Sequence, residues 1–151
     1  ALAAGYPLLD TAQAERWGYR EADVGGALEA TGVPRAKVFL QTKIDPENLG
    51  VAATRRSFAE SLGRLRTTYV DSLLIHKPRC WEGACRRSTE GTWQDSWKVL
   101  EELFEEGKTR AIGMCDVDEA LLDELLRQKY RPHIVQNWMD PFHQDRHIRD
   151  R

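Results

Sequence analysis

Short apolar runs alternate along this chain with segments whose apolar residues recur every three or four positions. Runs of this length are typical of buried strands, and the longer period is typical of amphipathic helices. The pattern predicts strands at residues 6–11, 37–43, 70–75, 110–114 and 133–138.

Helices are predicted in the segments between these strands. In one of them Phe58, Leu62 and Leu65 follow one another at steps of four and three, which places them on one apolar stripe. Glycines are expected to end the first and third helices, and Asp116 or Asp118 to cap the last. The predicted helices cover about residues 21–31, 51–65, 93–106 and 121–126.

Regular alternation of strands and helices implies right-handed crossovers and a parallel sheet, either doubly wound or closed as a (β/α)8 barrel. No Gly-x-Gly-x-x-Gly follows the first predicted strand, and no P-loop pattern occurs. Instead Asp10, Lys43 and His76 stand at the C-terminal ends of strands, where barrel enzymes carry their chemistry. We therefore predict an α/β fold of (β/α)8 TIM-barrel type, incomplete at about five consecutive β/α units, with residues 1–151 as one partial domain.

The composition limits the kinds of binding partner and the cellular compartments that we expect for this protein. With 22 Lys and Arg against 24 Asp and Glu, the net charge of −2 gives no basic surface for nucleic acid or an anionic membrane. No apolar run approaches the ~20 residues that span a bilayer, and no signal peptide is visible. We expect a soluble protein of a reducing compartment, cytoplasmic or organellar, a plastid included. Cys80 and Cys85 are then expected to be unpaired loop thiols, and Cys115 a small buried residue.

The three strand-end residues suggest a type of reaction. A carboxylate such as Asp10 would keep the ammonium of Lys43 charged, and that ammonium could make a neighbouring phenol a better general acid. His76 beside the phenol could orient a carbonyl oxygen. Such a set suits reduction of an aldehyde or ketone by an external hydride, which a nicotinamide would supply.

Several sequence motifs occur in order along nearly the whole chain. They are GYPLLDTA at 5–12, EADVGGAL at 21–28, VFLQTK at 38–43, SFAESLGRL at 57–65, YVDSLLIHKP at 69–78 and GKTRAIG at 107–113. In this order and spacing they resemble the aldo-keto reductases. The resemblance implies a (β/α)8 barrel that reduces small carbonyl substrates with NADP, using a catalytic Asp, Tyr, Lys and His.

On this match Asp10, Lys43 and His76 take three of the four catalytic roles. Counting back from the EADVG motif places the tyrosine at Tyr19 or the glycine before it, whereas counting forward from Asp10 places it at Glu15. We take Tyr19 as the proton donor. With Glu15 in that place the chain would be a pseudoenzyme, because a carboxylate is not an equivalent weak acid.

The resemblance also implies a nicotinamide site at the ends of the last two predicted strands. Where the family has a Ser-Asn pair, this chain has Cys115 and Asp116, and the family's Asn-Gln pair is matched by Gln136 and Asn137 in reversed order. These four are the expected cofactor-binding residues. The first strand, the last two strands and the clamp for the 2′-phosphate of NADP are expected to be missing from the chain.

An incomplete barrel leaves open sheet edges and an apolar inner face, so the chain is expected to need the rest of its barrel or a protein partner. One hypothesis is an aldo-keto-reductase-like oxidoreductase whose 151-residue piece is inactive by itself. The alternative is a non-catalytic, reductase-derived structural or regulatory subunit of a larger assembly.

Two further sets of residues have simpler interpretations. Trp93 and Trp97 lie one helical turn apart and are expected to pack in a core or an interface. His143 and His147 would share one face of a helix, but the metalloprotease pattern is incomplete, and no metal site is predicted.

Overall fold

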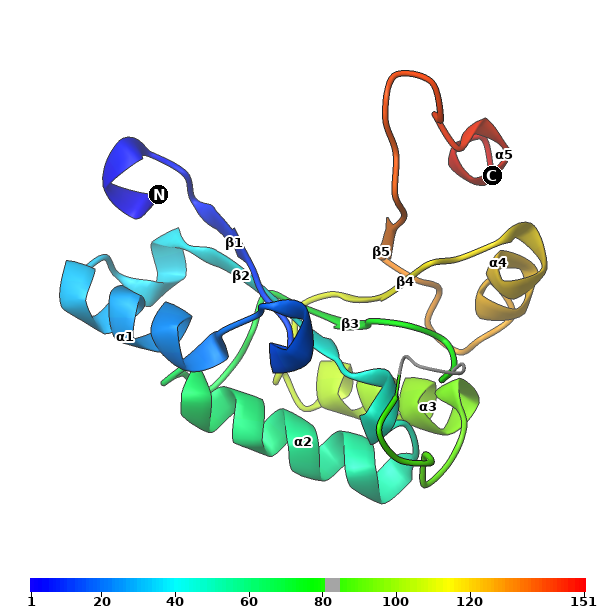
Figure 1. The fold of residues 1–151 in the computed structure, drawn as a ribbon, viewed down its shortest axis with the longest axis horizontal. Helices are drawn as coiled ribbons and strands as arrows, with labels where there is room; N and C mark the ends of the chain where they lie inside the picture. Colours follow the sequence, from blue (N-terminus) through cyan, green and yellow to red (C-terminus); the bar gives the residue numbers. More distant parts are fainter. Residues whose placement is uncertain (81–84) are drawn as a thin grey trace.

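A computed structural model of the chain describes residues 1–80 and 85–151. Its strands form one parallel sheet in the order β1-β2-β3-β4-β5 (Figure 1). They are β1 (Leu8–Asp10), β2 (Phe39–Ile44), β3 (Ser72–Ile75), β4 (Ile112–Cys115) and β5 (Ile134–Gln136). A doubly wound sheet reverses its strand order at a switch point, whereas a barrel wall adds each strand beside the last. The sheet is therefore half of a TIM-type barrel, which confirms the predicted fold class.

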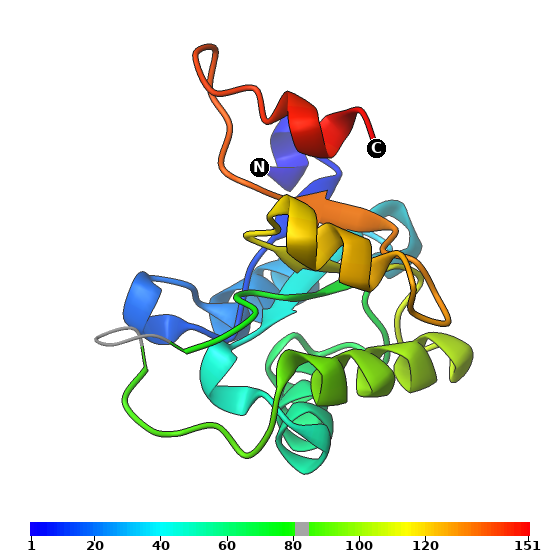
Figure 2. The ribbon, with the colours of Figure 1, turned by 90° about the vertical axis from the view of Figure 1, so that its right-hand side faces the viewer.

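Among the described residues, four α-helices lie between successive strands as predicted, and a fifth follows the last strand. They are α1 (Glu21–Thr31), α2 (Val51–Arg64), α3 (Trp93–Glu105), α4 (Glu119–Leu125) and α5 (Arg146–Arg149), with short 3-10 turns η1 (Leu2–Ala4), η2 (Glu15–Trp17), η3 (Arg35–Lys37) and η4 (Pro46–Asn48). Figures 1 and 2 show α2 and α3 packed beside each other against the same face of the sheet. Asp118 caps α4 by accepting a hydrogen bond from the backbone N–H of Leu121 at 2.8 Å.

The core lies between the helices and the outer face of the sheet. Alternate strand residues such as Leu40, Ile44 and Ile112 are fully buried there. Trp93 and Trp97 project from α3 into this core, so the prediction that they pack internally is confirmed. The apolar faces of the helices pack against the apolar side chains on the outer face of the sheet, as expected for a β/α wall.

The opposite face of the sheet is open. Because side chains alternate along a strand, Leu8 and Asp10 of β1 share this face with Phe39, Gln41 and Lys43 of β2. Leu8 and Phe39 are register partners, and both are exposed. Exposed apolar side chains on an inner barrel face indicate a surface that further protein would cover.

The loop after β3 differs from prediction in its cysteines. Cys80 and Cys85 form a disulfide, with their Cα atoms 5.7 Å apart, so the expectation of unpaired loop thiols was wrong. A spacing of five residues gave no signal of pairing, because the loop conformation decides whether the two Cβ atoms meet. Cys115 is free and buried, as expected.

The C-terminal segment also differs from prediction. Helix α5 begins at Arg146, so it includes His147 but not His143, and the two imidazoles do not share a helix face. Among the described residues, no group of three or more His, Cys, Asp or Glu side chains could hold a metal ion. Across residues 1–80 and 85–151, no helix is both long enough and apolar enough to cross a membrane.

Gly113 allows β4 and β5 to pair closely. A Cβ at this position would lie 2.1 Å from the carbonyl oxygen of Ile134, its register partner. We expect Gly113→Ala to lower the free energy of unfolding by roughly 1–3 kcal/mol, measured by urea denaturation. Gly26→Ala in α1 is the control, because an added methyl there meets nothing within 4 Å and removes a helix-interior glycine. Equal effects of the two substitutions would contradict this account of the β4–β5 pairing.

The disulfide predicts the number of free thiols in the protein. When the protein is denatured without reductant, alkylation and mass spectrometry should label one of its three cysteines, Cys115. Addition of reductant before alkylation should label all three. Labelling of all three without reductant would show that Cys80 and Cys85 are not joined.

Candidate active site

An ion pair between a buried lysine and a partly exposed aspartate joins the C-terminal ends of β1 and β2. The Nζ of Lys43 lies 2.5 Å from Oδ1 of Asp10 and donates a second hydrogen bond to the carbonyl oxygen of Thr11 at 3.2 Å. Lys43 is almost completely buried, at 1% exposed. A buried ammonium requires a charged partner, which Asp10 supplies. The structure therefore brings these two predicted residues into contact.

A hydrogen-bonded chain of side chains crosses the open face beside this pair. Gln41 donates to Oδ1 of Asp10 at 2.9 Å and to Oε1 of Gln136 at 2.8 Å. Gln136 donates to Oδ2 of Asp10 at 3.1 Å, and Ser72 donates to Oε1 of Gln41 at 2.7 Å. Asp10 is thus fixed by β2 and β5 together. Sequence reasoning missed Gln41 and Ser72, although a polar residue within an apolar strand could have marked each of them.

His76 follows β3 and contacts two aromatic rings. Its ring centroid lies 5.0 Å from that of Trp17 and 5.3 Å from that of Tyr19, both approached edge to face. Burial, together with the nearby charges of Lys43 and Lys77, lowers the pKa of His76 to about 4. His76 is therefore neutral at physiological pH, and its Nδ1 is buried without a hydrogen bond among the described residues.

The turn from β1 to α1 decides which residue takes the fourth position. Gly18 adopts a left-handed conformation with φ of 92°, after which Tyr19 turns toward the sheet. The Nζ of Lys43 lies 5.2 Å from the ring centroid of Tyr19. Glu15 is exposed and lines a different cavity together with Arg86. Tyr19, and not Glu15, lies with Asp10, Lys43 and His76.

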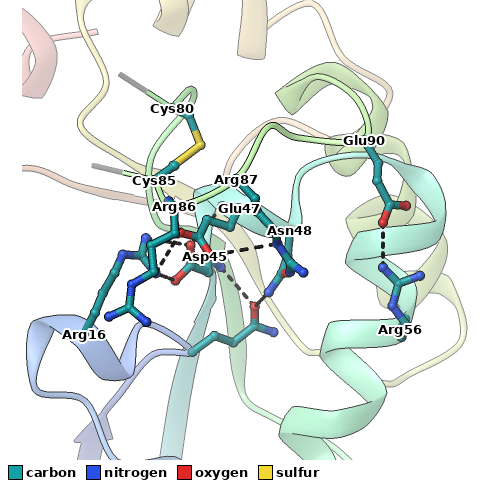
Figure 3. A network of polar contacts seen from close by, with 11 residues as sticks. Arg16, Asp45, Glu47, Asn48, Arg56, Cys80, Cys85, Arg86, Arg87 and Glu90 are labelled. Carbon is teal, nitrogen blue, oxygen red and sulfur yellow. Dashed lines mark hydrogen bonds and ion pairs between the residues drawn. A yellow bond between two sulfur atoms is a disulfide. The ribbon is translucent and has the colours of Figure 1, made fainter. Parts of the chain in front are cut away.

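The same turn is fixed to the loop after β2 by a polar network (Figure 3). Arg16 makes two hydrogen bonds to the carboxylate of Asp45, at 2.5 and 2.8 Å. Oε1 of Gln13 accepts from the backbone N–H of Asp45 at 3.0 Å and from Asn48 at 2.9 Å. Asn48 in turn accepts from Arg87, just beyond the disulfide loop, at 2.7 Å. A bidentate guanidinium–carboxylate pair is a strong and directional contact, so the turn has a defined position.

An open cleft of about 200 Å³ extends from Tyr19, Lys43 and His76 to the ends of β4 and β5. It is lined by Tyr19, Lys43, His76, Lys77, Cys115, Asp116, Gln136, Asn137 and Trp138. All four predicted cofactor residues therefore border the same cleft as three of the predicted catalytic residues.

The four residues at the β4–β5 end differ in what they can offer a ligand. Burial raises the pKa of Cys115 to about 12, so its thiol stays protonated. Asp116 is ion-paired with Lys77 across the cleft. The amide of Asn137 is used within the chain, since it accepts from Val117 N–H at 2.9 Å and donates to Val117 C=O at 2.8 Å.

Gln136 fits a carboxamide ligand best. Its Nε2 uses one hydrogen for Asp10, and the second has no partner among the described residues. Its Oε1 accepts strongly from Gln41, and the thiol of Cys115 is a weak donor at 3.9 Å. An amide carries two donors and an acceptor oxygen with two lone pairs, so Gln136 retains a donor toward the cleft.

Comparisons with known proteins agree with the family resemblance of the sequence. The family model described as "Aldo/keto reductase family" matches residues 1–150. The chain is 39% identical over 127 residues to morphine 6-dehydrogenase of Pseudomonas putida, covering 83% of this chain and 39% of that protein. It is 32% identical over 151 residues to glyoxal reductase of Bacillus subtilis, covering 99% of this chain and 50% of that protein.

Solved structures show the same relationship. An aldo/keto reductase from Brucella melitensis matches with a TM-score of 0.84 and 32% identity, over 98% of this chain and 54% of that one. A Bombyx mori aldo-keto reductase in complex with NADP matches with a TM-score of 0.78 and 26% identity, over 91% and 45%. The chain thus spans about half or less of the length of each of these proteins. With the family model matching almost every residue, the chain belongs to the aldo/keto reductase family.

Proposed function

We propose that the protein carrying this chain reduces small aldehydes or ketones with NADPH, and that Asp10, Tyr19, Lys43 and His76 are its catalytic residues. The observation that carries the proposal is the meeting of these four side chains at one edge of the sheet. They come from β1, the following turn, β2 and the residue after β3. A structural role alone would not require a buried lysine, a neutral histidine and a phenol at one cleft.

The proton for the carbonyl oxygen comes from the phenol of Tyr19. As the carbonyl carbon gains a hydride, its oxygen takes this proton and the alcohol is formed. The ammonium of Lys43, 5.2 Å from the phenol ring centroid, stabilises the phenolate that remains until solvent returns the proton. Asp10 holds Lys43 in place and balances its charge.

His76 orients the carbonyl group. Because its pKa lies near 4, it is uncharged at neutral pH and acts through hydrogen bonding, not as a proton donor. An imidazolium at this place would lie beside the charges of Lys43 and Lys77, which burial makes unfavourable.

The cofactor end of the cleft is formed by β4 and β5. Bound NADPH supplies the hydride. Gln136 holds the nicotinamide carboxamide through its remaining amide donor, and Cys115 and Asp116 border the same region. The Bombyx mori structure with NADP supports a site of this kind in the family, which the proposal extends to this chain.

The alternative function is a non-catalytic, reductase-derived subunit. The observation behind it is the exposed apolar pair Leu8 and Phe39 on the open face, which in such a subunit a partner protein would cover in place of the rest of the barrel. An intact catalytic set fits this alternative less well than the reductase proposal.

The tyrosine provides the test of activity. In the protein that carries this chain, Tyr19→Phe should lower kcat for glyoxal by about 10²- to 10⁴-fold, because it removes the proton donor. The rate is measured as NADPH oxidation. Glu15→Gln is the matched control and should leave the rate unchanged, since Glu15 is exposed outside the cleft.

NADPH binding by fluorescence separates the two functions. Binding with turnover that depends on Tyr19 supports the reductase. A Tyr19→Phe variant as active as the wild type, or loss of activity in Glu15→Gln instead, would refute the assignment of the proton donor. Absence of both binding and turnover would favour the subunit.

The buried histidine gives a pH dependence of stability. The unfolded chain protonates His76 near its ordinary pKa of 6.5, but the folded protein does so only near 4. Stability due to the neutral histidine is therefore present above pH 6.5 and lost as the pH falls toward 4. Between pH 7 and 4.5 the wild type should lose about 2 kcal/mol more than His76→Gln. Urea unfolding at the two pH values measures this, and parallel losses would show that His76 titrates normally.

A further inference from the structure

The disulfide of Cys80 and Cys85 lies in the loop that follows β3 and His76. Both cysteines belong to this one loop, so the bond ties no two helices or strands together. A disulfide that closes a short loop also stabilises a fold less than one that closes a long loop. Stabilisation of the whole fold is therefore not enough to explain its presence.

Both cysteines are accessible to a reductant. Each is half-buried, and their sequence neighbours Arg79 and Arg86 are exposed. Arginine side chains stabilise the thiolate that leaves when a disulfide opens, which favours thiol–disulfide exchange. Partly exposed cysteines in basic surroundings are typical of redox-active sites, whereas buried ones such as Cys115 are inert.

The residues after the disulfide are attached to the loop after β2 (Figure 3). The backbone N–H of Arg86 donates to Oε1 of Glu47 at 2.5 Å, and the guanidinium of Arg87 donates to Asn48 at 2.7 Å. Both contacts are exposed to solvent, so each by itself is weak. The disulfide holds the neighbouring Cys85 in place, which keeps both arginines close to their partners.

From Asn48 the contacts continue to the turn from β1 to α1. Asn48 donates to Oε1 of Gln13 at 2.9 Å, and Arg16 makes its two hydrogen bonds to Asp45 beside it. Gln13 and Arg16 belong to the turn that places Tyr19 at the cleft. A continuous chain of contacts thus leads from the disulfide to the side chain of the proposed proton donor.

We propose that Cys80 and Cys85 form a thiol–disulfide exchange site that takes a dithiol reductant, and that its redox state controls how firmly the turn before Tyr19 is held. In the oxidised protein the turn is anchored through residues 85–87, and in the reduced protein this anchor is loosened. The exchange and the loosening do not depend on the proposed function. Only their effect on carbonyl reduction rests on it.

The exchange is balanced in atoms and electrons. A thiolate of the dithiol attacks one sulfur of the disulfide, which forms a mixed disulfide and releases the other cysteine as a thiolate. The second thiol of the dithiol then attacks the mixed disulfide and releases the remaining cysteine. Two electrons and two protons pass to Cys80 and Cys85, and the dithiol becomes a cyclic or intramolecular disulfide.

The exchange is tested on the native protein with dithiothreitol as the dithiol. Alkylation and peptide mass spectrometry should show Cys80 and Cys85 reduced without unfolding, while the buried Cys115 stays unlabelled. Reduced glutathione at the same concentration of thiol groups should reduce far less, because the freed neighbouring cysteine expels it from the mixed disulfide. A disulfide that resists dithiothreitol until urea unfolds the protein, or that glutathione reduces equally well, would overturn the site.

The loosening is tested by hydrogen exchange of the backbone amides of residues 13–19. This exchange should be about threefold to tenfold faster in the reduced protein and in Cys85→Ser than in the oxidised protein. Arg87→Ala, with the disulfide intact, should show part of this increase. Arg56→Ala is the matched control, since it removes another exposed arginine contact of the same loop, to Glu90 at 2.7 Å, that does not lead to the turn.

The same redox states are compared for turnover in the protein that carries this chain. Reduction should lower kcat/KM for glyoxal about threefold to tenfold, and Cys85→Ser should show the lower value with or without dithiothreitol. Equal hydrogen exchange in both redox states, or equal effects of Arg87→Ala and Arg56→Ala, would overturn the control of the turn. If NADPH is oxidised in neither redox state, the proposed function fails, and the labelling and hydrogen-exchange results still decide this proposal.

Discussion

The ion pair of Lys43 and Asp10 constrains the rest of this structure. An ammonium that is 1% exposed is stable only beside its carboxylate, so the ends of β1 and β2 must stay in register. Asp10 in turn accepts from Gln41 and Gln136, which extends this requirement to β5 on the far side of the sheet. The polar side chains of the inner face therefore form one connected network, and Lys43 and Gln136 of this network line the cleft.

The fold could be predicted from the sequence because its signals are local. The α1 bounds, the Asp118 cap and the packing of Trp97 follow from periodicity and capping preferences. The site could be predicted in part, because parallel strands bring their C-terminal residues to one edge. Tyr19 needed the structure, since its position depends on the left-handed turn at Gly18, which counting along the chain cannot supply.

The disulfide, and the pairing of residues within the inner polar network, could not be predicted for a similar reason. Cys80 and Cys85 pair through a loop conformation, and Gln41 meets Gln136 across 95 residues of sequence. Both contacts depend on how distant backbones approach each other. The open face, in contrast, could be predicted. Leu8 and Phe39 are exposed because the chain forms only part of an eight-stranded barrel, so nothing covers the inner face of the sheet.

The distribution of tryptophans has a spectroscopic consequence. Among the described residues, Trp93 and Trp97 are shielded in the core, whereas Trp17, beside His76, and Trp138, in the cleft lining, are exposed. A soluble quencher such as acrylamide reaches the second pair and not the first. For these four tryptophans, emission that survives quenching reports on the helical layer, and emission that is lost reports on the surroundings of His76 and on the cleft. Trp138 is thus an optical probe for occupancy of the cleft, without any added label.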